Sequence, residues 1–109
     1  MIKELARKVA LEKALPKRAE WDETGEFPWE AIKAFAAADL AGLYIPEAYG
    51  GMGAGILSYS LAIEEISRIC GGVGVTFAAS GLGTAPILLF GSEEQKKKYL
   101  PDIAAGKKL

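Results

Sequence analysis

The first apolar pattern lies between residues 2 and 14, where apolar positions recur one helical turn apart. Charged residues fall largely on the other faces, so the pattern predicts an amphipathic helix. Pro16 should end or bend this helix, although residues 17–21 could continue it beyond a kink. The sequence from Asp22 to Gly25 is typical of a turn.

A second apolar stripe follows Pro28, a residue tolerated at the first position of a helix because its missing N–H would be unpaired there. The spacing predicts a helix that Gly42 ends, since glycine accepts the left-handed conformation common after a helix. Residues 43–46 look extended, and a glycine-rich loop, residues 47–55, follows them.

Three more helices are predicted after that loop. The third covers about residues 56–70 and the fourth about residues 73–90, with two glycines between them. The fifth begins with a Ser-x-x-Gln capping box at Ser92; Pro101 should interrupt it and Gly106 should close it. The sequence therefore predicts an all-α domain, a compact bundle of about five helices.

The fourth helix lies in the longest uncharged stretch, the 24 residues from Ile69 to Ser92. That length can cross a bilayer, but six glycines, Pro86 and several hydroxyl residues dilute the hydropathy. A buried central helix is the favoured interpretation, and a membrane span is the less favoured one. Between Gly74 and Gly83 most residues are small. This suits either close helix packing or a flat, elongated ligand, and spacing alone leaves both open.

The amino-acid composition excludes several classes of catalytic and binding site. The net charge is −1, which gives no overall attraction to nucleic acid or to an anionic membrane. Histidine is absent, which removes histidine-based nucleophile pairs and metal sites. The single cysteine, Cys70, excludes an internal disulfide and suits a reducing compartment, and no signal-peptide pattern opens the sequence.

Other motifs favour structural roles. Gly53 and Gly55 belong to no complete Gly-x-Gly-x-x-Gly motif and follow no strand, so the loop is interpreted as a tight connection. Glu64 and Glu65 are adjacent and would point about 100° apart on a helix. We expect them on a solvated face or paired with Arg68, without a catalytic or metal role.

Five segments, in this order, resemble a known family: residues 23–28 (ETGEFP), 41–53 (AGLYIPEAYGGMG), 63–67 (IEEIS), 83–87 (GTAPI) and 91–101 (GSEEQKKKYLP). The series is similar to the N-terminal helical domain of the acyl-CoA dehydrogenases and covers almost the whole chain. The resemblance implies an enzyme that uses FAD to dehydrogenate acyl-CoA thioesters and passes electrons to an electron-transfer flavoprotein. It also implies a homo-oligomer in the cytoplasm or, in a eukaryote, the mitochondrial matrix.

The family has three domains, and the resemblance implies that residues 1–109 are only the first, incomplete at both ends. The β-domain, the C-terminal bundle with its catalytic carboxylate and almost all flavin contacts would lie elsewhere. The chain alone would then hold no FAD and have no activity. We expect no catalytic, cofactor-binding or metal residues here. Matched from Pro86 backwards, the resemblance implies that the acyl chain contacts Val75, Ala78, Ala79 and Leu82.

Three alternatives stay open from the sequence. One is a non-catalytic helical interaction module, and another is a small membrane protein built on residues 69–92. The third is a related chemistry of the same superfamily, such as an oxidase or a nitroalkane-oxidising enzyme, which residues outside this chain would determine.

Overall fold

The computed structural model describes all 109 residues, and they form α-helices and short 3₁₀ turns with no strand. The elements are α1 (Ile2–Lys13), α2 (Arg18–Thr24), α3 (Trp29–Ala37), η1 (Leu40–Gly42), η2 (Glu47–Tyr49), α4 (Gly55–Ile69), α5 (Gly71–Phe90) and α6 (Glu93–Ala104). The all-α prediction is confirmed. The structure has six α-helices instead of about five, because Arg18–Thr24 forms the separate helix α2.

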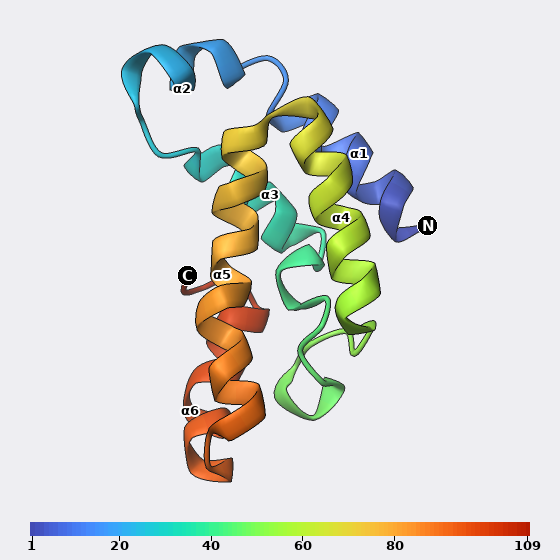
Figure 1. Ribbon diagram of the computed structural model, residues 1–109, viewed down its shortest axis with the longest axis vertical. Coiled ribbons are helices and arrows are strands. Elements are labelled where there is room, and N and C mark those ends of the chain that lie inside the picture. Colours follow the sequence, from blue (N-terminus) through green and yellow to red (C-terminus); the bar gives the residue numbers. More distant parts are fainter.

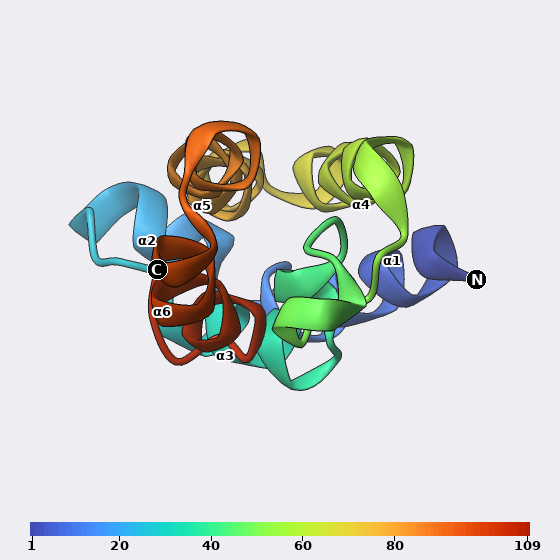
Figure 2. The same cartoon turned by 90° about the horizontal axis from the view of Figure 1, so that it is seen from below.

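The helices lie in two layers. Helices α4 and α5 run antiparallel, side by side, and α1, α3, α6 and the 3₁₀ turns lie beneath them (Figures 1 and 2). Cys70 makes the reversal between α4 and α5 with a single extended residue, at φ −151° and ψ 110°. The side of α4 and α5 that faces away from the lower layer is bare of other elements (Figure 2).

The core fills the space between the two layers. The fully buried residues in and just after α1 are all alanines, Ala6, Ala10 and Ala14, which let α1 approach α4 closely. Ile2, Leu5 and Val9 of α1 pack against the core and are partly buried. The larger buried side chains come from α3, α4, α5 and the 3₁₀ region: Phe35, Leu40, Leu43, Tyr59, Ile66, Val73 and Phe77. A second small cluster of Ile45, Leu100 and Ala104 fixes α6 against the loop before α4.

The second predicted helix ends earlier than expected. Helix α3 stops at Ala37 because Asp39 adopts the left-handed conformation at φ 60°, which Asp tolerates better than most residues. A separate 3₁₀ turn then covers Leu40–Gly42. Residues 43–45 form turns and a bend, so the prediction of an extended segment was wrong there. These turns connect α3 to the glycine loop that precedes α4.

Two further predictions of helix ends need correction. Asp22 to Thr24 belong to α2, and the turn begins only at Gly25, at φ 71°. Helix α6 continues through Pro101 to Ala104. The proline removes one hydrogen bond to the carbonyl of Lys97, an exposed residue, where water can replace it. The predicted capping box at Ser92 is confirmed, with both of its hydrogen bonds present.

Helix α5 is not the fully buried helix that the sequence favoured. Only 22% of its most apolar 18-residue window is buried, because the helix packs on one face alone. By length and composition it is the one helix that could cross a membrane, a test that core helices of soluble proteins also pass. The bare face of α5 is therefore the feature that needs an explanation.

Candidate functional site

The four residues predicted to contact a ligand share the bare face of α5. Successive residues of a helix turn by 100°, so Val75, Ala78, Ala79 and Leu82 fall within about a third of its circumference. The buried Phe77 lies on the opposite side. Val75 is 70% and Leu82 77% exposed, Ala79 is exposed and Ala78 is half-buried. The structure thus gathers the four residues on one surface that no other element of the chain covers.

This surface, which we call the outer face of α5, continues to the end of the helix. Pro86 and Leu89 extend it, and Leu89 is 72% exposed. Val75, Leu82 and Leu89 are seven residues apart, so they form one row along a helix about 30 Å long. No charged residue occurs from Gly71 to Phe90. A continuous exposed apolar strip of this kind marks a ligand or interaction surface.

Two tyrosines hold the opposite face of α5. The hydroxyl of Tyr59 donates to the carbonyl of Phe77 at 2.9 Å, and that of Tyr44 donates to the carbonyl of Gly81 at 2.9 Å. The centroids of the two tyrosine rings lie 4.7 Å apart. Gly81 makes the approach possible, since a Cβ there would lie 2.8 Å from the Tyr59 hydroxyl. These contacts leave no signal in the sequence, because no local pattern joins Tyr44 to a residue 37 positions away.

Both hydroxyls are kept protonated by their surroundings. Burial, together with the neighbouring Tyr44, raises the pKa of Tyr59 to about 12. Burial also raises the pKa of Tyr44 above its ordinary value. Tyr59 and Tyr44 therefore act as hydrogen-bond donors to α5 and do not exchange protons near neutral pH.

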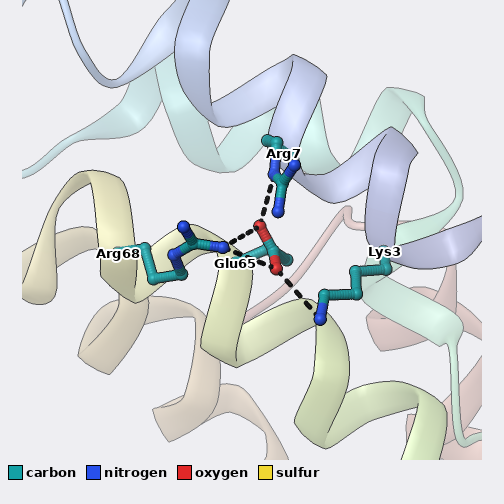
Figure 3. Close-up of polar contacts among 4 residues, drawn as sticks. All are labelled: Lys3, Arg7, Glu65 and Arg68. Carbon is teal, nitrogen blue, oxygen red and sulfur yellow. Dashed lines mark hydrogen bonds and ion pairs between the residues drawn. The ribbon is translucent and has the colours of Figure 1, made fainter.

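Glu65 is the one charged side chain buried in the protein, and three partly exposed cations surround its carboxylate (Figure 3). Its side chain is 1% exposed, and its carboxylate meets Arg7 Nε at 2.6 Å, Lys3 Nζ at 3.4 Å and Arg68 Nη1 at 3.3 Å. The predicted pairing with Arg68 is confirmed, but Glu65 is not on a solvated face. Lys3 and Arg7 come from α1, and sequence spacing could not have indicated them.

The cations around Glu65 set its charge. The hydrogen bond from Arg7 is the main cause that lowers the pKa of Glu65 to about 2, and the charges of Arg7 and Arg68 and a hydrogen bond from Lys3 add to it. A carboxylate that stays ionised and fully paired at neutral pH is no general acid or base. The cluster joins α1 to α4 and has no catalytic geometry.

The glycine loop before α4 is a tight connection, as predicted. Gly50, Gly53 and Gly55 all have positive φ angles, which other residues rarely adopt. Backbone hydrogen bonds from Met52 N to Gly42 O at 2.8 Å and from Gly53 N to Ile45 O at 2.9 Å close the loop on the preceding turn. Its N–H groups are used inside the protein, so the loop is no phosphate cradle.

The hollows of the chain are too small or too open to enclose a ligand. A cavity between α3, α4 and α5, lined by Phe35, Tyr59 and Phe77, has a volume of about 20 Å³, roughly the space of one water molecule. A larger groove of about 370 Å³ between α2 and the start of α5 is open to solvent. Ligand sites usually bury most of the ligand in 300–1,000 Å³. A binding site on the outer face of α5 therefore needs a second wall from outside these residues.

Comparison with known proteins agrees with the fold. Residues 1–107 match the family model described as acyl-CoA dehydrogenase, N-terminal domain. The chain is similar to an acyl-CoA dehydrogenase of Bacillus subtilis (strain 168), 45% identical over 107 residues, 97% of this chain and 28% of that protein. It is also similar to a probable medium-chain specific acyl-CoA dehydrogenase 2, mitochondrial, of Caenorhabditis briggsae, 41% identical over 104 residues, 95% of this chain and 26% of that protein.

One solved structure gives the same result in three dimensions. It is described as an acyl-CoA dehydrogenase complexed with FAD from Bacillus anthracis, and it superposes with a TM-score of 0.90 at 41% identity. The match covers 100% of this chain and 19% of that one. The chain thus spans about a quarter of the length of the curated relatives that it matches.

Proposed function

The chain belongs to the acyl-CoA dehydrogenase family, as its N-terminal domain, and from this premise we propose that it forms one wall of an acyl-binding site. The reaction that the site serves is the α,β-dehydrogenation of an acyl-CoA thioester in a larger, flavin-dependent protein. Val75, Ala78, Ala79 and Leu82 contact the acyl chain. None of the 109 residues carries the chemistry, and this chain supplies the shape of the site.

One observation carries this proposal: the outer face of α5 is apolar, uncharged and exposed, and its middle is flat. Leu82 is 77% exposed, and the neighbouring Ala78 and Ala79 project only a methyl group each. A hydrocarbon chain buries about 0.8 kcal/mol of favourable transfer energy per CH₂ without needing a polar partner. A face that offers no hydrogen-bond donor or charge suits the acyl chain better than the polar nucleotide of CoA.

We propose that this chain does not hold FAD by itself. FAD carries a pyrophosphate, which dinucleotide folds hold on a glycine turn between a strand and a helix, and this chain has no strand. Its largest hollow near a helix start is an open groove with both acidic and basic residues. We therefore place the flavin contacts in the rest of the protein, where the flavin would accept the substrate's hydride.

The remaining expectations concern the whole protein. We propose that it uses FAD, passes electrons to an electron-transfer flavoprotein and assembles as a homo-oligomer. Its place is the cytoplasm in a bacterium or the mitochondrial matrix in a eukaryote. The two relatives described above, one bacterial and one named mitochondrial, support these alternatives. Family membership leaves the membrane-protein alternative without support beyond the length of α5.

A domain exchange tests the proposal. The part of this chain that matches the Bacillus subtilis relative replaces the corresponding part of that protein, and the purified chimera is examined for flavin absorbance and for acyl-CoA-dependent reduction of an artificial electron acceptor. We expect a yellow protein that oxidises acyl-CoA. Ala78→Trp in the chimera should reject long acyl chains and keep short ones, because the larger ring fills the space over the flat part of the face.

The matched control is Glu64→Gln, an exposed position on the neighbouring helix α4. It should leave the acyl preference unchanged. A chimera that binds flavin but oxidises no acyl-CoA would contradict the proposed function. That result would favour the non-catalytic interaction module, in which the same apolar face covers a protein partner.

A further inference from the structure

We propose that Tyr44 and Tyr59 are positioning residues, which hold the turn of α5 that carries Ala78 and Leu82 and so set which acyl groups the site accepts. The inference rests on the proposed function for its effect on acyl groups. The holding of α5 itself is a separate property of the chain, and it can be tested without any substrate.

The two tyrosine hydroxyls bind peptide groups directly next to Ala78 and Leu82, two of the residues proposed to contact the acyl chain. Tyr59 donates to the carbonyl of Phe77, which shares its peptide plane with the N–H of Ala78. Tyr44 donates to the carbonyl of Gly81, which shares its plane with the N–H of Leu82. A shift of either hydroxyl therefore moves the peptide plane, and with it a side chain on the outer face. The second contact of Tyr59, to the carbonyl of Ala78 at 3.4 Å, strengthens this link.

Helix α5 needs such support in its middle. Gly81 and Gly83 favour a helix less than other residues do, and Pro86 provides no N–H for the carbonyl of Leu82. The hydroxyl of Thr84 bonds back to the carbonyl of Ser80 at 2.6 Å, a contact that commonly bends helices. The local sequence therefore does not determine the direction of the helix axis in the middle of α5. Contacts from other elements are needed to fix it.

The two tyrosines belong to elements other than α5 and pack in or against the hydrophobic core. Tyr59 is 6% exposed on α4 and packs against Phe77, with the ring centroids 5.4 Å apart. Phe77 in turn packs edge-to-face on Phe35 of α3, also at 5.4 Å. Tyr44 lies in the turn between η1 and η2, in the layer beneath α4 and α5. The two hydroxyls thus reach the middle of α5 from both layers, Tyr59 from α4 and Tyr44 from the layer beneath it.

The first test uses the full 109-residue chain and measures amide hydrogen exchange residue by residue. Tyr59→Phe and Tyr44→Phe each remove one hydroxyl and keep the ring. Amides of residues 78–85 should exchange about three to ten times faster, the effect of losing one hydrogen bond, while those of α1 stay unchanged. Tyr49→Phe is the matched control, since its hydroxyl donates to Glu93 and does not touch α5.

The second test places the same variants in the chimera and compares kcat/KM for long and short acyl-CoA substrates. Tyr59→Phe and Tyr44→Phe should change the ratio at least threefold and leave kcat for a short substrate unchanged, whereas Tyr49→Phe should change neither. A general loss of stability would lower all rates together. If Tyr59→Phe does not fold, Tyr44→Phe, which is only half-buried, carries both tests.

The outcomes separate the two proposals. Faster exchange confined to residues 78–85 with a changed ratio supports the inference. Uniform or unchanged exchange overturns it, as does local loosening with the same substrate ratio. An unsubstituted chimera that oxidises no acyl-CoA overturns the proposed function, and the exchange data then still decide whether the tyrosines hold α5.

Discussion

Arg7 of α1 and Glu65 of α4 form the shortest ion pair in the protein, with 2.6 Å between Arg7 Nε and the Glu65 Oε2. The two residues are 58 positions apart in the sequence, and the carboxylate is buried between α1 and α4 (Figure 3). The pair joins α1 to α4, and Lys3 of α1 also contacts Glu65, at 3.4 Å. A buried charge that loses its partners is costly, so this contact should matter more to stability than a surface ion pair does.

Replacement of Glu65 by Gln should destabilise the chain. The amide keeps the size of the side chain but removes the charge that three cations share, and it leaves Arg7 and Lys3 facing a neutral group. We expect the melting temperature to fall by roughly 5 °C or more in a thermal unfolding experiment. Glu64→Gln is the control, because the same charge is lost from an exposed position and the melting temperature should hardly change. Equal effects of the two variants would contradict a special role of Glu65.

The same cluster predicts how stability depends on acid. The pKa of Glu65 is about 2 in the folded chain and near 4.5 when unfolded, so the unfolded state binds the proton first as the pH falls. The contribution of Glu65 is complete above about pH 4.5 and is lost as the pH falls towards 2. Denaturant unfolding between pH 6 and 2 should show a steeper loss for the unsubstituted chain than for Glu65→Gln. Parallel curves for the two proteins would rule out this assignment.

The sequence was most informative where structure is decided locally. The capping box at Ser92 was predicted and is present, because its partners are three residues apart. Asp39, which ends α3 early, was missed, because one residue in a left-handed conformation leaves no periodic signal. For Glu65 the sequence predicted a solvated face or a pairing with Arg68, and the pairing is present. The burial of Glu65 and its shortest contact, to Arg7, were missed because Arg7 lies 58 residues earlier in the sequence. Errors therefore arose where tertiary contacts override the local pattern.

For the candidate site, the sequence predicted the helix but not which of its faces is buried and which is exposed. Nearly every residue of α5 is apolar or small, so no alternation of polar and apolar positions distinguishes Phe77, which is buried, from Val75, which is exposed. The family resemblance named the outward residues, and the structure places them together on one face. Tyr44 and Tyr59 could not be predicted, because their hydrogen bonds cross between elements distant in the sequence.

Two glycines of α5 should respond in opposite ways to alanine. A Cβ at Gly81 would lie within 2.8–3.1 Å of three atoms of Tyr59, whereas nothing lies within 4 Å at Gly83. Gly81→Ala should therefore destabilise the chain by about 1–3 kcal/mol through overpacking. Gly83→Ala should stabilise it by about 0.5–1 kcal/mol, because alanine favours a helix. Denaturant unfolding measures both, and a stabilised Gly81→Ala variant would show that Tyr59 is not held where the structure places it.

The bare face of α5 predicts that the chain associates with itself when it is alone in solution. Leu82 is 77% exposed in the middle of an apolar strip, and strips of this kind pack against other apolar surfaces to remove water. Leu57, at the start of α4, is 71% exposed but lies outside the strip, so Leu57→Gln controls for the loss of one exposed leucine. Light scattering after size-exclusion chromatography should show dimers or larger species for the chain and for Leu57→Gln, and a shift to monomer for Leu82→Gln. An unsubstituted chain that stays monomeric at high concentration would mean that the outer face tolerates water and needs no covering partner or ligand.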